Sequence, residues 1–136
     1  MNQKIKYYLS RFEKDDSITL NSTVESIQQQ IDFKLPEDYL DVIKEVKEGE
    51  GEIGNNSWLQ LYPLERVVQV NINYRLLMQQ IPDFFLFGKD AADTGYAFHK
   101  RQHTYHSFGL MSNFNTDFIT FCGNTFEGFL EYLYNK

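Results

Sequence analysis

The chain has a single cysteine, Cys122, and no apolar run long enough to cross a bilayer. One cysteine excludes an internal disulfide and a zinc site built from several cysteines. A helix that spans a bilayer needs about 20 mostly apolar residues. The first twelve residues contain lysines but lack the apolar core of a secretion signal. We therefore expect a cytoplasmic protein that is not embedded in a membrane.

Basic side chains are scarcer than acidic ones. The sequence has 13 Lys and Arg against 19 Asp and Glu, which gives a formal net charge of −6. Proteins that bind a phosphate backbone usually present a basic surface, so direct binding of nucleic acid is not expected. A basic protein partner would suit this charge, although a net negative charge also serves solubility alone.

The length of the chain predicts one domain, residues 1–136, because 136 residues can bury a core without cross-links or metals. Aromatic residues make up 16% of the sequence, mostly as 12 Phe and 9 Tyr. Such a composition is typical of a packed globular domain and not of a disordered chain.

Three stretches in the first third of the chain have apolar residues three and four apart, which is the spacing of one helix face. These residues are Ile5, Tyr8, Leu9 and Phe12; Val24, Ile27 and Ile31; and Tyr39, Leu40, Ile43 and Val46. Thr23 is placed to cap the second helix, and Pro36 marks the first turn of the third. Gly49 and Gly51 are expected to end the third helix.

The middle of the chain changes to strand patterns. Residues 58–62 alternate in polarity, which predicts a strand. The apolar run Phe84–Phe87 suits a strand buried on both faces, with Gly95–Phe98 as its hairpin partner. Further strands are predicted near residues 105–111 and 117–122.

Residues 64–80 fit both a helix and an alternating strand, and the three-and-four spacing that continues to Gln80 favours the helix. A last helix is predicted over residues 126–134, with Thr125 as its cap. Helices, then mostly antiparallel strands, then a helix is the pattern of the α+β class. The strand aromatics expected in the core are Phe84, Phe85, Phe87, Tyr96, Phe98, Phe108, Phe114, Phe118 and Phe121.

Several short motifs follow one another in a characteristic order. They are Leu35–Tyr39, the exit Gly49–Gly51, Leu59–Glu65, the strand and turn from Phe84 through Asp90 to Phe98, and Thr125–Leu130. In this order and spacing the chain resembles the SUKH superfamily over residues 22–134, and within it the branch named after the yeast cell-wall assembly regulator Smi/Knr. No single motif is specific for the family.

The resemblance implies a curved, mainly antiparallel sheet flanked by N-terminal helices and a C-terminal helix. It also implies a role as an immunity protein of a polymorphic toxin system, which binds and neutralises a cognate toxin domain such as a nuclease. The alternative is a regulatory or scaffold protein with a cellular partner, as in eukaryotic members. Neither role implies an enzyme, a catalytic residue set or a cofactor.

Two groups of residues are candidates for partner binding. The acidic candidates are Glu45, Glu48, Glu50 and Glu52 in a glycine-rich stretch, and Asp90 and Asp93 in a turn. A negative surface of this kind can steer a basic partner, but it is also what a solvated helix end looks like. Trp58 and Tyr62 share one strand face and are candidate interface anchors, with core packing as the alternative.

Three possible chemical sites are not supported. His99, His103 and His106 surround a predicted hairpin tip, with cationic neighbours that would repel a metal. The sequence 90–95 lacks the alternating oxygen ligands of a calcium loop, so we expect Asp90 or Asp93 to bind local backbone instead. Cys122 lies in an apolar strand pattern and is expected to be an inert thiol.

Overall fold

A computed structural model of the chain describes residues 1–14 and 24–136. This part of the chain forms six helices and a seven-stranded sheet. The helices are α1 (Gln3–Tyr8), α2 (Val24–Gln30), α3 (Glu37–Val46), α4 (Leu64–Asn73), α5 (Arg75–Met78) and α6 (Phe126–Tyr134). The strands are β1 (Phe12–Lys14), β2 (Gly49–Ile53), β3 (Ser57–Leu61), β4 (Phe84–Lys89), β5 (Thr94–His99), β6 (Tyr105–Gly109) and β7 (Thr120–Gly123).

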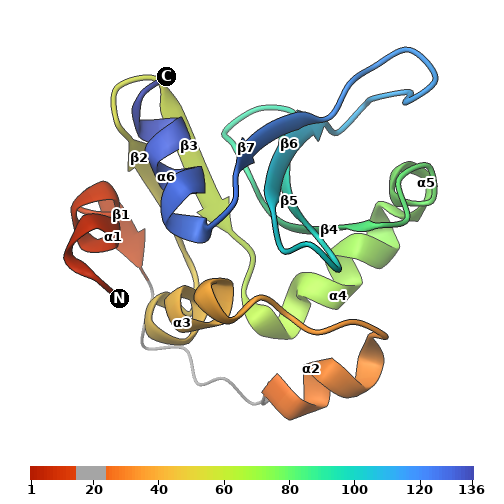
Figure 1. Cartoon of the computed structure of the whole chain (residues 1–136), viewed down its shortest axis with the longest axis horizontal. Helices are drawn as coiled ribbons and strands as arrows, with labels where there is room; N and C mark the ends of the chain where they lie inside the picture. Colours follow the sequence, from red (N-terminus) through yellow and green to blue (C-terminus); the bar gives the residue numbers. More distant parts are fainter. Residues whose placement is uncertain (15–23) are drawn as a thin grey trace.

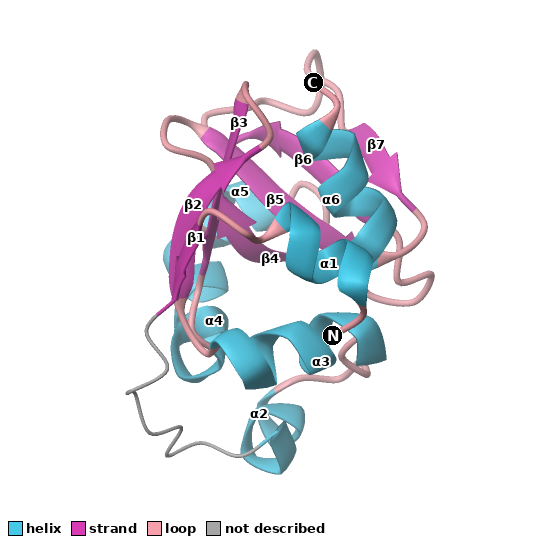
Figure 2. Ribbon diagram, turned by 90° about the vertical axis from the view of Figure 1, so that its left-hand side faces the viewer, coloured by secondary structure: helices cyan, strands magenta, loops and turns pink. Residues whose placement is uncertain are grey.

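The sheet is antiparallel throughout, and its strands lie in chain order from β1 to β7. It is strongly curved, and α6 lies in its concave side (Figure 1). Figure 2 shows α1 and α3 on the same side as α6, with α4 next to α3. The predicted α+β class is therefore confirmed, as are the curved sheet and the flanking helices. No helix among the described residues is long and apolar enough to span a membrane.

Two apolar clusters fill the two faces of the sheet. The larger cluster packs α3 and α6 on the concave face, where Phe87 contacts the rings of Tyr39, Tyr105 and Phe129. The smaller cluster packs α5 on the other face, against Leu86 of β4. Side chains of β4 therefore enter both clusters, which confirms the prediction of a strand buried on both faces.

Most of the predicted elements are present. Pro36 precedes α3 directly, Glu37 and Asp38 occupy its first turn, and Lys44 its last. The helical alternative for residues 64–80 is confirmed by α4 and α5. Thr125 caps α6, because its hydroxyl accepts a hydrogen bond from the Gly128 backbone nitrogen at 3.0 Å. The predicted cap at Thr23 lies outside the described residues.

The predicted end of α3 is wrong. The helix stops at Val46, and Lys47 turns the chain with a φ of 64°. Gly49 and Gly51 belong to β2, so residues 49–52 form a strand and not a solvated helix end. A Cβ at Gly49 would lie 2.7 Å from the Glu13 carbonyl oxygen, and one at Gly51 would lie 2.6 Å from that of Arg11. The two glycines are therefore needed for the close approach of β1 to β2.

Two apolar stretches also differ from their predicted places. Phe12 leaves the first helix and pairs with Gly51 as part of β1, because α1 ends at Tyr8. The last strand begins only at Thr120, so the predicted strand over 117–122 is shorter than expected. Phe118 is 87% exposed and Phe121 is 53% exposed. The prediction that both belong to the core is therefore wrong.

The carboxylate of Asp38 joins three distant parts of the chain. It accepts hydrogen bonds from the Tyr105 hydroxyl at 2.7 Å, the Phe126 backbone nitrogen at 2.7 Å and the Tyr39 backbone nitrogen at 2.9 Å. These donors belong to β6, the start of α6 and α3. The two acidic residues that follow Pro36 thus have different roles, since Glu37 lies exposed while Asp38 fixes the packing of α6.

Replacement of Asp38 by alanine should lower the free energy of unfolding by about 2–4 kcal/mol, because it leaves partly buried donors on Tyr105 and Phe126 without an acceptor. Glu37→Ala, one residue away in the same turn, is the matched control and should change it by no more than about 0.5 kcal/mol. Urea unfolding measures both values. Equal effects of the two substitutions would contradict the role of Asp38.

Substitution of two buried tyrosines by phenylalanine should have different effects on the free energy of unfolding. Among the described residues, the buried hydroxyl of Tyr39 has no hydrogen-bond partner, whereas the hydroxyl of Tyr105 donates to Asp38. Tyr39→Phe should leave the free energy of unfolding unchanged or raise it by about 1 kcal/mol, and Tyr105→Phe should lower it by about 1–3 kcal/mol. Thermal and urea unfolding of the pair test this, and a larger loss for Tyr39→Phe would show that the Tyr39 hydroxyl has a partner.

Candidate functional site

The outer face of the β1–β3 end of the sheet carries the predicted acidic residues of β2. Gly49, Gly51 and Ile53 are buried, and the side chains of Glu50 and Glu52, which alternate with them, are exposed to solvent. Glu52 pairs across the sheet with Trp58, and Glu50 pairs with Gln60. Because residues directly opposite one another share a face, these side chains form one continuous surface.

Each of the four predicted glutamates has a partner on the protein itself. Glu45 of α3 lies 3.4 Å from the N-terminal ammonium, Glu48 lies 3.3 Å from Arg66, and Glu52 lies 3.1 Å from Arg11. Glu50 accepts a hydrogen bond of 3.4 Å from the Trp58 indole nitrogen. The four glutamates are thus distributed over α3, the turn after it and β2. Exposed ion pairs of this type are worth at most about 1 kcal/mol, so a partner's cation can replace them.

Three of the predicted site residues line one shallow hollow of about 370 Å³, namely Glu52, Trp58 and Asp90. We call it the Trp58 hollow. Its walls are the β2–β3 turn and the β4–β5 turn, and the side chains of Tyr96 and Lys136 complete it. Residues that are far apart in the sequence therefore meet at one place, which holds two carboxylates, a half-buried indole and one lysine.

Hydrogen bonds fix the strands and the turn that form the Trp58 hollow. The Tyr96 hydroxyl donates to the Trp58 carbonyl oxygen at 3.1 Å, which ties β5 to β3. The Asp90 carboxylate accepts from the backbone nitrogens of Ala92 at 2.8 Å and Thr94 at 3.0 Å, and so fixes the β4–β5 turn. The predicted local bonding of Asp90 to backbone is confirmed.

The C-terminal end of α6 holds the other wall. Ser57 donates to the Leu133 carbonyl oxygen at 2.7 Å, and Asn56 donates to that of Lys136 at 2.8 Å. Gly54 turns with a φ of 68°, and a Cβ there would collide with the backbone of Tyr134. The position of α6 thus determines where the β2–β3 turn, and with it Trp58, can lie.

The other candidate residues lie apart from the Trp58 hollow. Tyr62 follows the end of β3 and packs on the larger core cluster; burial and nearby Tyr74 raise its pKa to about 12. Asp93 is exposed, and its backbone carbonyl accepts a hydrogen bond from the Leu110 nitrogen at 2.6 Å. Glu45 and Glu48 do not line the hollow either.

Two contributors to this surface were missed by the sequence analysis. Arg11 pairs with Glu52, and Glu13 lies opposite Glu50 on the same face. Both belong to the β1 region, which the helical spacing of Phe12 had hidden. The exposed polar residues on either side of Phe12 are the one signal that could have indicated a strand.

The three histidines each have a separate partner around the β5–β6 turn. His99 Nδ1 accepts from the Arg101 backbone nitrogen at 3.2 Å, His103 Nε2 lies 2.9 Å from the Lys34 carbonyl oxygen, and His106 Nε2 lies 2.7 Å from the Thr104 hydroxyl. Within residues 1–14 and 24–136, no three His, Cys, Asp or Glu side chains are placed to hold a metal ion.

Cys122 is buried at the end of β7, as predicted, and its thiol lies 3.5 Å from the Ser107 hydroxyl. Burial raises the pKa of the Cys122 thiol, although the Ser107 hydroxyl partly offsets this. A thiol in this environment stays protonated at neutral pH and is a poor nucleophile.

Comparison of the sequence with models of known protein families found no match, and comparison with curated protein sequences found none either. The relationship to the SUKH superfamily therefore stays a hypothesis, which rests on the order of the motifs.

His106 should make the stability of the protein depend on pH. Burial and, to a smaller extent, His99 lower the pKa of His106 below its usual value near 6.5. The unfolded chain therefore binds a proton more readily than the folded one, and the free energy of unfolding should fall as the pH falls below about 6.5.

In the parent protein the centre of the His106 ring lies 4.9 Å from that of Phe84 and 5.6 Å from that of Phe121. The variant His106→Phe tests the pH dependence, because it keeps an aromatic ring in this position but removes the titrating group. Urea unfolding at pH 7.5, 6.5 and 5.5 should show a shallower loss of stability in the variant than in the parent protein. Identical pH profiles would exclude His106 as the source.

Proposed function

We propose that this domain binds a basic protein surface through the Trp58 hollow, and that its partner is a toxin domain which it neutralises as a SUKH-type immunity protein. The observation that carries the proposal is the meeting of Glu52, Trp58 and Asp90 at one exposed, rigid place. The net charge of −6 and the motif order support it.

The geometry of the hollow suits a lysine or arginine of a partner. Trp58 offers a flat aromatic surface, and tryptophan is both a frequent interface anchor and the best aromatic partner for a cation. Glu52 and Asp90 line the hollow with Trp58, and Glu50 adds negative charge from the same face of the sheet. Lys136 also lines the hollow, but its ammonium lies over the Tyr132 ring, 5.5 Å from the ring centre. A guanidinium that enters the hollow can replace Arg11 at Glu52, since that ion pair is exposed.

Neutralisation then follows from occlusion. The hollow and the outer face of β1–β3 offer a continuous surface of rigid sheet, so little ordering is required when a partner docks. Basic residues are common where a nuclease holds its phosphate backbone. A domain that covers such residues with its own carboxylates and an aromatic anchor would exclude the nucleic acid, without any catalytic step of its own.

The direct test is growth rescue by co-expression with the toxin domain encoded beside this gene, followed by affinity measurements on the purified pair. Trp58→Ala should weaken binding by about 2 kcal/mol, roughly thirtyfold. Glu52→Lys should slow association and flatten its dependence on salt. Matched controls are Phe118→Ala, which removes an exposed aromatic ring elsewhere, and Glu37→Lys, which reverses an exposed charge on α3.

The possible outcomes test the immunity role and the docking surface separately. Rescue that fails with both proteins soluble would contradict the immunity role and favour a regulator with a cellular partner. Rescue that persists, with affinity unchanged by Trp58→Ala and Glu52→Lys, would leave the role intact and exclude the Trp58 hollow as its site. The variant Asp90→Asn keeps the turn's acceptor and removes only the charge, so its effect reports electrostatics alone.

A further inference from the structure

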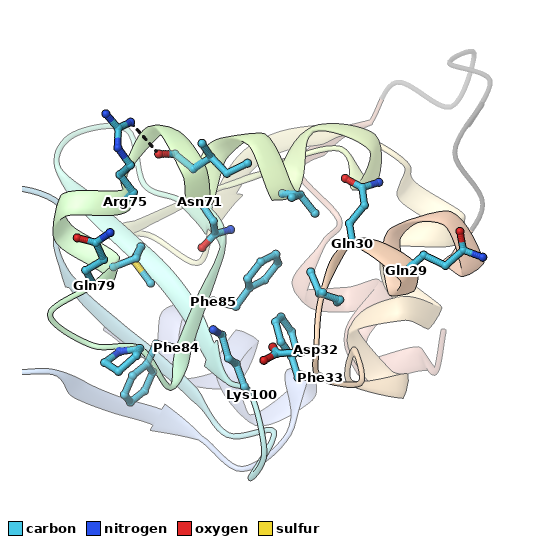
Figure 3. A pocket seen from close by; sticks show the side chains of 15 residues that line it. Gln29, Gln30, Asp32, Phe33, Asn71, Arg75, Gln79, Phe84, Phe85 and Lys100 are labelled. Atoms are coloured by element: carbon cyan, nitrogen blue, oxygen red, sulfur yellow. Dashed lines mark hydrogen bonds between the residues drawn. The ribbon is translucent and has the colours of Figure 1, made fainter.

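A second, larger cavity lies on a different side of the molecule from the Trp58 hollow. It has a volume of about 630 Å³ and runs between α2, the α4–α5 segment and β4 (Figure 3). We call it the α2–α4 groove. This volume is within the range of about 300–1,000 Å³ typical of small-molecule sites.

The groove exists because β3 and β4 separate. They pair at Gln60 with Lys89 and at Leu61 with Gly88. One more bond, from the Tyr62 nitrogen to the Phe87 carbonyl oxygen at 3.1 Å, follows before Pro63 precedes α4. Along the rest of β4, the Asn71 side chain of α4 takes the place of a neighbouring strand. Its amide accepts from the Leu86 nitrogen and donates to the Leu86 oxygen, both at 2.9 Å. The floor of the groove is therefore a fixed part of the sheet.

The lining of the groove is mainly apolar and aromatic. Phe84 and Phe85 form the floor, Phe33 stands on the α2 side, and Ile72 belongs to the opposite wall on α4. Ile72 is 48% exposed, so part of its side chain is accessible to a ligand at the rim of the groove. These surfaces suit a flat, apolar ligand body.

One cation extends into this apolar space. Lys100 follows β5 directly, and its backbone nitrogen donates to the Asp83 carbonyl oxygen at 2.8 Å, which fixes the start of the side chain. Its ammonium lies 5.1 Å from the centre of the Phe33 ring. Figure 3 shows the side chain between Phe84 on one side and Phe33 on the other, with the ammonium toward the interior of the groove.

The charges around Lys100 favour an anionic ligand. The lining holds two cations, Lys100 and Arg75, against one carboxylate, Asp32, and no carboxylate of the described residues forms an ion pair with either cation. An adjoining hollow shares Lys100 and adds Lys34, Arg101 and His103. Arg101 and Lys34 already pair with Asp83 and Glu37 at 3.3 Å and 3.4 Å. Arg75 also lines the groove, where it donates to the Ile72 carbonyl oxygen at 3.5 Å, and the Lys100 ammonium is the cation that lies between the aromatic rings.

We propose that the α2–α4 groove binds a small organic carboxylate with an aromatic or similarly flat apolar body. The body packs between Phe33, Phe84, Phe85 and Ile72, and the carboxylate accepts a hydrogen bond from the Lys100 ammonium. This site is independent of the Trp58 hollow and of the partner proposed for it. A charge-assisted hydrogen bond and aromatic packing at one place define the ligand class.

The test uses two probes that differ only in charge, 1-naphthylacetate and its neutral amide, 1-naphthylacetamide. Each is titrated into the ¹⁵N-labelled protein, and backbone amide shifts are followed by NMR. The acid should saturate shifts at Phe85, Ile72 and Lys100, and should bind about fivefold more tightly than the amide.

Three variants separate the contributions. Lys100→Gln should remove the difference between acid and amide, Ile72→Gln should weaken both probes equally, and Lys4→Gln on α1 should change neither. All three residues are outside the buried core, so the variants should fold. Equal affinity of acid and amide for the parent protein, an unchanged preference in Lys100→Gln, or shifts that do not saturate in the groove would each overturn the proposal.

Discussion

The Asp38 carboxylate is the contact on which the rest of the structure depends. Its three hydrogen bonds hold the start of α6 against α3 and β6. The other end of α6 holds Ser57 and Asn56, and so places the β2–β3 turn. Burial and the Asp38 carboxylate raise the pKa of Tyr105, so that its hydroxyl remains a donor at every physiological pH. A single acidic residue in the first turn of α3 therefore determines, through α6, where Trp58 is presented.

Much of this fold could be predicted because local signals and tertiary packing agree. Pro36 and Thr125 start their helices through backbone and capping effects that depend only on neighbouring residues. The apolar run before Gly88 is buried in any sheet that has both faces covered. Other predictions were wrong because tertiary contacts, and not local signals, determine the structure there. Gly49 and Gly51 signal a helix end locally, but they are there because β1 approaches them closely. The exposure of Phe118 and Phe121 depends on where β7 begins, which no local pattern indicates.

The candidate site was predictable in its residue types but not in its arrangement. Charge and aromatic content pointed to Glu52, Trp58 and Asp90, and the structure brings these three together. Sequence spacing could not show that Glu45, Glu48 and Tyr62 lie elsewhere, because the alternation of β2 and the turn at Lys47 separate them. The α2–α4 groove was not predicted, since it arises from the separation of β3 and β4 and from the use of the Asn71 amide in place of a strand. The two surfaces lie at different places, so the proposed protein partner and the proposed small anion would not compete for one site.

We propose that the partner docks on the Trp58 hollow, and this can be tested on the complex itself. Hydrogen–deuterium exchange, measured on this protein alone and in complex with the toxin domain proposed as its partner, reports where the partner docks. Docking on the Trp58 hollow should slow exchange in the β2–β3 turn, residues 52–58, and in the β4–β5 turn, residues 90–94. A stable complex in which these two turns exchange as they do in the free protein, with protection elsewhere, would contradict it.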